Sequence, residues 1–205
     1  LLAADVSLVA QIMKIVNSAY FGLPHPIRDV KHAVAYLGLG EIKRVALAVF
    51  VMDSLAPEDT EEFEQFWYHS FHTALTAKLV AKQFSAGIDP EELYVSALLH
   101  DVGKLVYLKF FPEQYLEMTQ YAEQHSTTLV GAEEALERPS HAAFGALLCG
   151  RWSLGDTVAQ ACLTHELQDL KKINRNALSC SDDIRVICIS NALSNLVTRQ
   201  LSAPH

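Results

Sequence analysis

The chain has 205 residues, half of them hydrophobic, and a formal net charge of −8, so it can bury a sizeable core in one large domain or two small lobes. No run of Lys or Arg forms a basic stripe, which argues against nucleic-acid partners because phosphate neutralisation dominates that affinity. No apolar run reaches the roughly 18 residues that a membrane span needs, so we expect no membrane partner.

The ends of the chain and its cysteines favour a cytoplasmic setting. The first residues lack a basic start and are interrupted by Asp5, which is not typical of a signal peptide. Because the chain opens at Leu1, already inside an amphipathic pattern, we expect it to be a piece of a longer protein. The four cysteines show no C-x-x-C spacing and are typical of reduced thiols in the cytoplasm.

The first quarter of the chain predicts three helices. Apolar residues recur at helical spacing over residues 5–18, 29–38 and 40–52. Gly22 favours the end of the first helix, and Asn17 is expected to cap backbone groups there. An acidic segment over residues 57–64 is the best internal boundary, so we predict a smaller helical lobe over residues 1–56 and a second body over residues 57–205.

The second body is also expected to be helical. A long helix is predicted from about Thr60 to Phe84, and Asp89 followed by Pro90 is a strong helix start. This next helix is expected to run on through His100 and Asp101 until Pro112 breaks the pattern. Further helices are expected over residues 112–125, 141–152, 158–165 and 184–201, with polar segments at 133–137 and 168–183. Without strand alternation or a hairpin signal, the fold class is predicted to be all-α.

His100 and Asp101 stand side by side in an otherwise apolar segment. Placing two titratable groups against a core costs several kcal/mol unless something compensates. A divalent metal is one compensator, since imidazole and carboxylate are both ligands of transition metals. A closed hydrogen-bond network is the other and needs no metal. The residues alone leave both interpretations open, and His69, His141 and His165 are the further histidines near helix ends or on apolar helices.

Two sets of motifs carry a resemblance to a known family. The dipeptide His69-Ser70, an alanine-containing helix and the stretch Leu98–Lys104 together resemble the HD superfamily of metal-dependent phosphohydrolases. Asn17-Ser18-Ala19 with Phe21-Gly22, Ala33-Val34, Leu37-Gly38, Trp67–Ser70, and His141 with Gly145 and Trp152 resemble the HDOD domain, the HD-related output domain of bacterial signalling proteins. The resemblance covers about residues 5–195 and implies a multi-helix HD-like bundle with a smaller N-terminal helical lobe.

The resemblance also implies a metal site. It implies that His69, His100 and Asp101 correspond to metal ligands of HD phosphohydrolases. His141 and His165 resemble extra histidines of the related HD-GYP phosphodiesterases. A late Asp of the family is replaced by Asn191, a neutral and weaker ligand, and no Gly-Tyr-Pro segment follows Glu166. The expected site is therefore vestigial, with a divalent Fe, Mn, Zn or Ni ion as its possible occupant.

Several of these residues have simpler interpretations. His100 and Asp101 can be a hydrogen-bonded core pair, His141 can fill a helix cap, and His165 can be held by a helix dipole. His72 shares a face with His69 but matches no family ligand, so it is expected beside the cluster or at the surface. Lys104 could meet a phosphate in an active enzyme, although at a helix end it is expected to face water.

The function that the resemblance implies is bacterial signal transduction through protein–protein or ligand contacts. Its expected partners are signalling proteins or a fused receiver or second-messenger domain. The alternative is a metal-dependent phosphohydrolase or cyclic-dinucleotide phosphodiesterase, in which the metal would generate hydroxide and polarise the phosphoryl oxygen. A nucleotide-sensing module without turnover is a third possibility. Fold alone does not decide among them.

Overall fold

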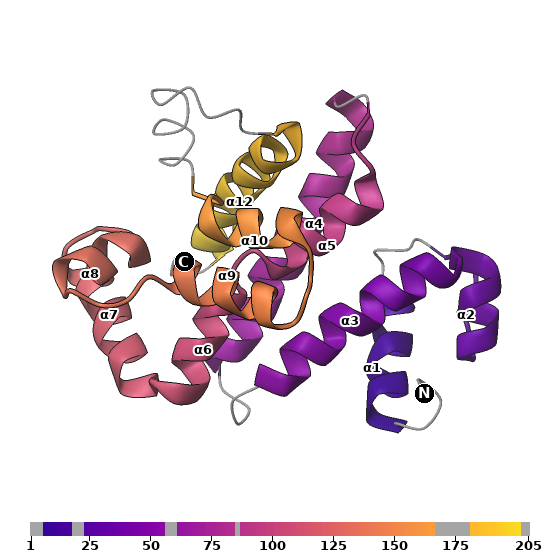
Figure 1. Cartoon of the computed structure of the whole chain (residues 1–205), viewed down its shortest axis with the longest axis horizontal. Coiled ribbons are helices and arrows are strands. Elements are labelled where there is room, and N and C mark those ends of the chain that lie inside the picture. Colours follow the sequence, from indigo (N-terminus) through magenta and orange to yellow (C-terminus); the bar gives the residue numbers. More distant parts are fainter. Residues whose placement is uncertain (1–5, 18–22, 56–60, 85–86, 167–180, 202–205) are drawn as a thin grey trace. The chain divides into compact units, whose positions relative to one another are not determined.

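The computed structural model describes residues 6–17, 23–55, 61–84, 87–166 and 181–201. Within these ranges all regular structure is helical and no strand occurs, which confirms the all-α prediction (Figure 1). The chain divides into two compact units, Leu1–Ser54 and Leu55–His205. Across the same ranges, no helix combines the length and apolar character needed to cross a membrane.

The first unit is built from α1 (Val6–Val16), α2 (Val30–Leu37) and most of α3 (Leu39–Leu55). Asp29 caps α2 by accepting a hydrogen bond from the backbone N–H of His32 at 2.8 Å, as its position before the apolar run suggests. The predicted end of the first helix at Gly22 lies outside the described residues. The core of this unit contains Ile12, Val16, Ile27, Ala33, Ile42, Val45, Ala46 and Val49.

The side chain of Asn17 links the end of α1 to the following connection by hydrogen bonds. Its side-chain Nδ2 donates to the carbonyl oxygens of Met13, at 3.0 Å, and of Ile27, at 2.8 Å. Its Oδ1 accepts from the backbone N–H of Ile27 at 2.7 Å. This amide therefore pairs with Ile27 much as a backbone peptide would, which confirms the predicted capping role.

The second unit surrounds a buried helix, α5 (Pro90–Leu99), in which every residue from Leu93 to Leu99 is buried. Helices α4 (Glu61–Phe84) and α12 (Asp182–Leu201) pack on α5 and on each other, and α10 (Asp156–Leu163) also packs on α5. Helix α9 (His141–Arg151) packs between α6 (Val102–Phe110) and α10. Helices α7 (Pro112–Gln124) and α8 (Leu129–Ala135) form a side pair (Figure 1).

Two features of this unit differ from the sequence prediction. The helix expected to run through His100 and Asp101 ends at Leu99, and α6 begins at Val102, so the pair lies in a turn. Adjacent residues of a continuous helix project roughly 100° apart, whereas this turn brings the His100 and Asp101 side chains into contact. Helix α8 also lies partly in the segment that appeared only polar, and Thr128 caps it.

Two glycines set how closely α6 and α9 approach. A Cβ atom built on Gly103 would lie 1.8 Å from the His141 carbonyl oxygen and 2.7 Å from the Gly145 nitrogen. A Cβ on Gly145 would lie 3.3 Å from the Gly103 nitrogen. Because the backbones touch here, the turn that carries Asp101 lies directly beside the first residue of α9, which is His141.

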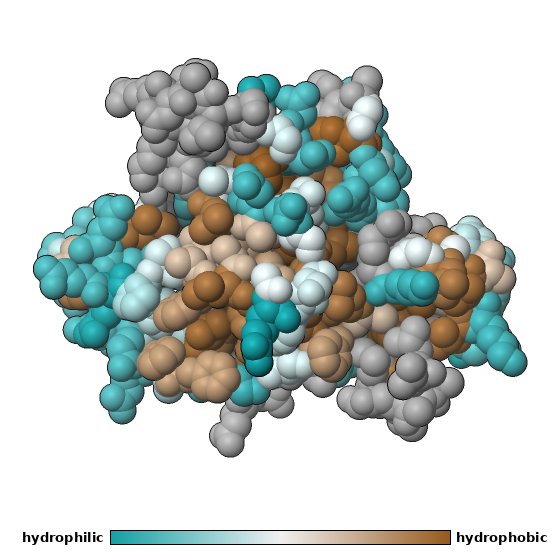
Figure 2. Space-filling model, viewed as in Figure 1, coloured by the Kyte–Doolittle hydropathy of each residue, from teal (hydrophilic) through white to brown (hydrophobic). Residues whose placement is uncertain are grey.

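The visible surface mixes polar and apolar areas. Figure 2 shows brown hydrophobic residues interrupted by teal and white ones. Large hydrophobic side chains exposed on the second unit include Leu79, Leu147 and Leu196. Single exposed apolar residues are normal on protein surfaces.

Candidate metal centre

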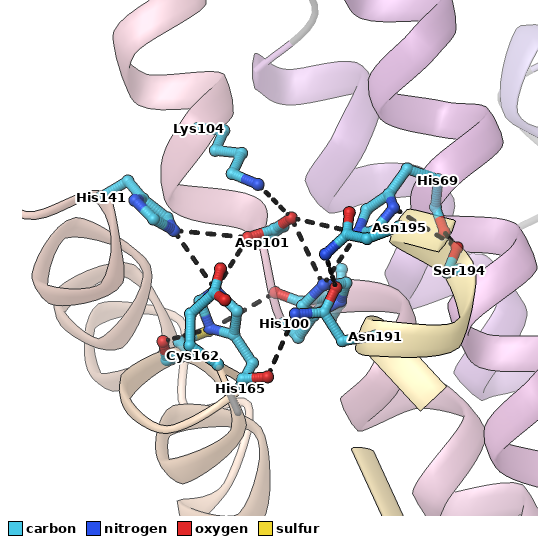
Figure 3. Close-up of polar contacts among 12 residues, drawn as sticks. His69, His100, Asp101, Lys104, His141, Cys162, His165, Asn191, Ser194 and Asn195 are labelled. Carbon is cyan, nitrogen blue, oxygen red and sulfur yellow. Dashed lines mark hydrogen bonds and ion pairs between the residues drawn. The ribbon is translucent and has the colours of Figure 1, made fainter. Parts of the chain in front are cut away.

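Asp101 is fully buried, and four histidines surround its carboxylate (Figure 3). Nε2 of His69 and of His100 lie 3.4 and 3.3 Å from Oδ2. Nε2 of His141 and of His165 lie 3.4 and 3.2 Å from Oδ1. All five residues singled out in the sequence therefore converge, although they come from α4, the α5–α6 turn, the start of α9 and the end of α10.

Three of the imidazoles bind hydrogen-bond acceptors through Nδ1, the ring nitrogen that does not face Asp101. An oxygen that only accepts requires a proton on the nitrogen it binds, so Nδ1 donates in each case. A neutral imidazole with Nδ1 protonated presents a lone pair at Nε2, the atom that faces Asp101. The Nδ1 partners are Ala97 O at 2.6 Å for His100, Cys162 O at 2.8 Å for His165 and Glu133 Oε1 at 2.6 Å for His141.

The inward-facing atoms are spaced to receive a metal ion. Two lone pairs facing a carboxylate oxygen repel one another unless a cation or a proton lies between them. Ligands about 2.1 Å from an ion lie about 3.0 Å apart in octahedral and about 3.4 Å apart in tetrahedral geometry. The His141–His165 and His69–His100 Nε2 pairs are both 3.3 Å apart, and the distances to Asp101 are 3.2–3.4 Å. Both groups of three donors therefore fit a transition-metal ion.

Lys104 also contacts Asp101, which corrects the expectation that it faces water. Its Nζ lies 2.5 Å from Oδ2 and its side chain is 19 % exposed. Burial opposes ionisation of Asp101, but the Lys104 ammonium and the neighbouring imidazoles of His100 and His165 outweigh burial and hold the pKa of Asp101 well below its usual range. Burial likewise disfavours the Lys104 ammonium, yet Asp101 raises the pKa of Lys104 above its ordinary value.

Glu133 supports His141 and was missed in the sequence. It is 2 % exposed, and its Oε1 accepts from both the backbone N–H, at 3.0 Å, and Nδ1 of His141. Burial lowers the pKa of His141, but the neighbouring Asp101 and Glu133 outweigh burial and raise that pKa. Such carboxylate–histidine pairs orient metal ligands in many proteins. The sequence did contain a signal for the burial of Glu133: Leu129, Ala132 and Leu136 share an apolar helix face, and position 133 lies on that face.

Asn191 lies beside His165, and its amide is engaged on both sides. Its Nδ2 donates to the His165 carbonyl at 3.1 Å, and its Oδ1 accepts from Asn195 at 3.3 Å. An ionised carboxylate at this position has no proton to donate to that carbonyl. Asn191 therefore stabilises the position of the His165 backbone.

His72 contacts the cluster through Ser194, another residue that the sequence analysis missed. Nδ1 of His72 lies 3.2 Å from the Ser194 hydroxyl, which in turn lies 3.4 Å from Nδ1 of His69. The same hydroxyl donates to the carbonyl oxygen of His69 at 3.3 Å.

The chain is similar in sequence and in fold to known proteins. A protein of Treponema pallidum (strain Nichols) is 28 % identical over 165 residues, which are 80 % of this chain and 32 % of that protein, so the chain spans about a third of that relative. An HDOD domain protein from Geobacter sulfurreducens superposes with a TM-score of 0.78 at 25 % identity, covering 95 % of this chain and 64 % of that one.

Two further solved structures share the fold. The "Putative phosphohydrolase" of Shewanella amazonensis SB2B has a TM-score of 0.78 at 20 % identity, covering 97 % of this chain and 68 % of that chain. The MmoQ response regulator of Methylococcus capsulatus str. Bath has a TM-score of 0.56 at 20 % identity, covering 96 % and 76 %. The HDOD domain family model matches residues 1–167, and with the His and Asp cluster in place the chain belongs to the HDOD domain family.

Proposed function

We propose that this chain is a regulatory domain of a bacterial signalling protein and that its buried centre binds a divalent transition metal without turning over a substrate. The observation that carries the metal is the convergence of four imidazole Nε2 atoms on Asp101. Three of these imidazoles are oriented by acceptors at Nδ1, as in metal sites whose ligands are held from outside. Fe, Mn, Zn and Ni all accept this donor set.

The closed character of the centre favours regulation over catalysis. A metal hydrolase needs an open coordination position for water and phosphate, where the ion supplies a low-pKa water and Lewis acidity. Here Asp101, His100, His141 and His165 are at most 2 % exposed, and the His69 side chain is 12 % exposed. In addition, an amide stands at Asn191, where the resemblance to HD phosphohydrolases implies an acid.

A bound ion would tie together segments that are far apart in the sequence. Asp101 precedes α6, His141 begins α9 and His165 follows α10, so these residues would hold the three segments in one arrangement. Anything that binds only the folded state stabilises it, by about 2.7 kcal/mol at a hundred times its dissociation constant. The packing of the second unit would then depend on the metal, and a signalling protein or a fused receiver domain could respond to the resulting change in packing.

The experiment combines metal content, stability and turnover. The protein is purified without chelator, its transition metals are quantified by mass spectrometry, and thermal unfolding is followed with and without added metal. Hydrolysis of bis(p-nitrophenyl) phosphate and of cyclic dinucleotides is measured alongside, with Asp101→Ala as the matched control. We expect bound metal, a higher melting temperature with metal in the wild type alone, and no turnover above the control.

Two outcomes would overturn this proposal. Turnover that Asp101→Ala abolishes would assign the chain to the phosphohydrolases. A protein that carries no metal and gains no stability from added metal would leave the cluster as a hydrogen-bonded core.

A further inference from the structure

The centre consists of two triangles of donor atoms that share Asp101 (Figure 3). The His141 triangle contains Asp101 Oδ1 with Nε2 of His141 and His165, and the His69 triangle contains Asp101 Oδ2 with Nε2 of His69 and His100. Their edges are all 3.2–3.4 Å. The lengths of these edges therefore do not distinguish the triangles, whereas the other contacts of the two Asp101 oxygens do.

A positive charge is already present at the His69 triangle. The Lys104 ammonium lies 2.5 Å from Oδ2, so an ion bound to that oxygen would lie beside a like charge. Oδ1 is buried and has no hydrogen-bond partner among the described residues. An orphaned buried carboxylate oxygen is costly, and a cation on the His141 triangle would satisfy it.

The charge balance around the centre permits one ion more readily than two. Asp101, Glu133 and Glu166, whose Oε1 lies 3.8 Å from His165 Nε2, supply three negative charges and Lys104 one positive charge, so one dication leaves the group neutral. A second dication would leave it at plus two in a place from which water is largely excluded. Asn191 stands where an acid would have offset part of that excess.

We propose that the centre takes a single divalent transition-metal ion, in the His141 triangle, and that Lys104 supplies the positive charge at the His69 triangle. This inference rests on the proposed metal binding and adds which half of the cluster does it. His141, His165 and Asp101 are then the protein ligands, a set of two imidazoles and one carboxylate suited to Zn or Fe(II). His69 and His100 are positioning residues, whose Nε2 atoms lie 3.4 and 3.3 Å from the other oxygen of Asp101.

The test compares two matched imidazole truncations. Zinc bound per chain is measured by mass spectrometry after equilibrium dialysis of the wild type, His165→Ala, His69→Ala and Lys104→Met, with circular dichroism to verify folding. We expect one ion in the wild type, none in His165→Ala, one in His69→Ala and two in Lys104→Met. Two ions in the wild type, or loss of the ion from His69→Ala with retention in His165→Ala, would overturn the assignment while leaving metal binding intact.

A second measurement needs no variant. Long-range ¹H–¹⁵N NMR of the wild type is recorded before and after addition of zinc. We expect the Nε2 resonances of His141 and His165 to take metal-bound shifts while Nε2 of His69 does not. Metal-bound shifts at His69 and His100 instead would contradict the assignment. Zinc absent from the wild type and from Lys104→Met would overturn the proposed function, and this inference with it.

Discussion

Replacing Gly103 by alanine tests how the turn of Asp101 is held against α9. The added methyl would lie 1.8 Å from the His141 carbonyl oxygen, whereas carbon–oxygen contacts are normally about 3.3 Å or longer. The obstacle is backbone, so the two helices must move apart by about 1 Å or more. Overpacking a core costs about 1–3 kcal/mol or more, and alanine recovers up to about 1 kcal/mol through helix propensity. We expect a net loss of about 1–2 kcal/mol, or roughly 2–8 °C in melting temperature.

Gly150 supplies the matched control for this substitution. It lies on α9, the helix that Gly103 faces, but it is exposed and an added Cβ meets no described atom within 4 Å. Gly150→Ala should therefore leave stability unchanged or raise it by about 0.5–1 kcal/mol. Urea denaturation of both variants and the wild type measures the difference. If Gly103→Ala proved as stable as Gly150→Ala, the close approach of α6 and α9 would be refuted.

Three further predictions concern single polar groups. Tyr107 donates a hydrogen bond to the Pro139 carbonyl, and its burial, followed by the charge of Glu133, raises the pKa of Tyr107. The stabilisation that Tyr107 provides is therefore complete below the pKa of an unfolded tyrosine, about 10, and is lost as pH rises through the pKa in the folded protein. Tyr107→Phe should cost about 1 kcal/mol at pH 7 and flatten the alkaline fall of the urea midpoint, and an unchanged fall would contradict this. Asn17→Asp should destabilise the first unit by about 2–3 kcal/mol, because a carboxylate would face two carbonyls, and an unchanged midpoint would refute it. Asn191→Asp should lower the melting temperature without zinc and recover it with zinc, since the new charge opposes the His165 carbonyl but favours a cation; an equal loss in both conditions would count against this.

Local chemistry was sufficient to predict most helix starts. Asp89 before Pro90 and Ser140 before His141 both cap their helices with side-chain hydrogen bonds, at 2.9 and 3.1 Å. Such caps depend on residues three or fewer positions away, so sequence spacing contains the needed information. The same holds for Asp29 at the start of α2.

The break between α5 and α6 could not be predicted in this way. Residues 93–105 form a nearly continuous apolar run without Pro, and Gly103 alone does not end a helix. The helix is interrupted because Asp101 contacts partners from three other segments, His69, His141 and His165, all distant in the sequence. These contacts outweigh local helix propensity, which is worth less than about 1 kcal/mol per residue.

The candidate site was predictable in its members but not in its charges. The five His and Asp residues could be named from their motifs, and the structure brings them together. Glu133 and Lys104 were missed as parts of the centre, because a Glu in a polar segment and a Lys at a helix end are usually solvated. Their roles follow from burial and from contacts that only the fold creates, at 2.6 Å to His141 and 2.5 Å to Asp101.

Anomalous X-ray diffraction at the zinc edge tests the central claim most directly, using crystals of zinc-loaded protein. The account predicts one strong peak about 2.1 Å from Asp101 Oδ1 and from Nε2 of His141 and of His165, with Lys104 still bound to Oδ2. A map without a peak in the cluster, or with its strongest peak between His69 and His100, would contradict it.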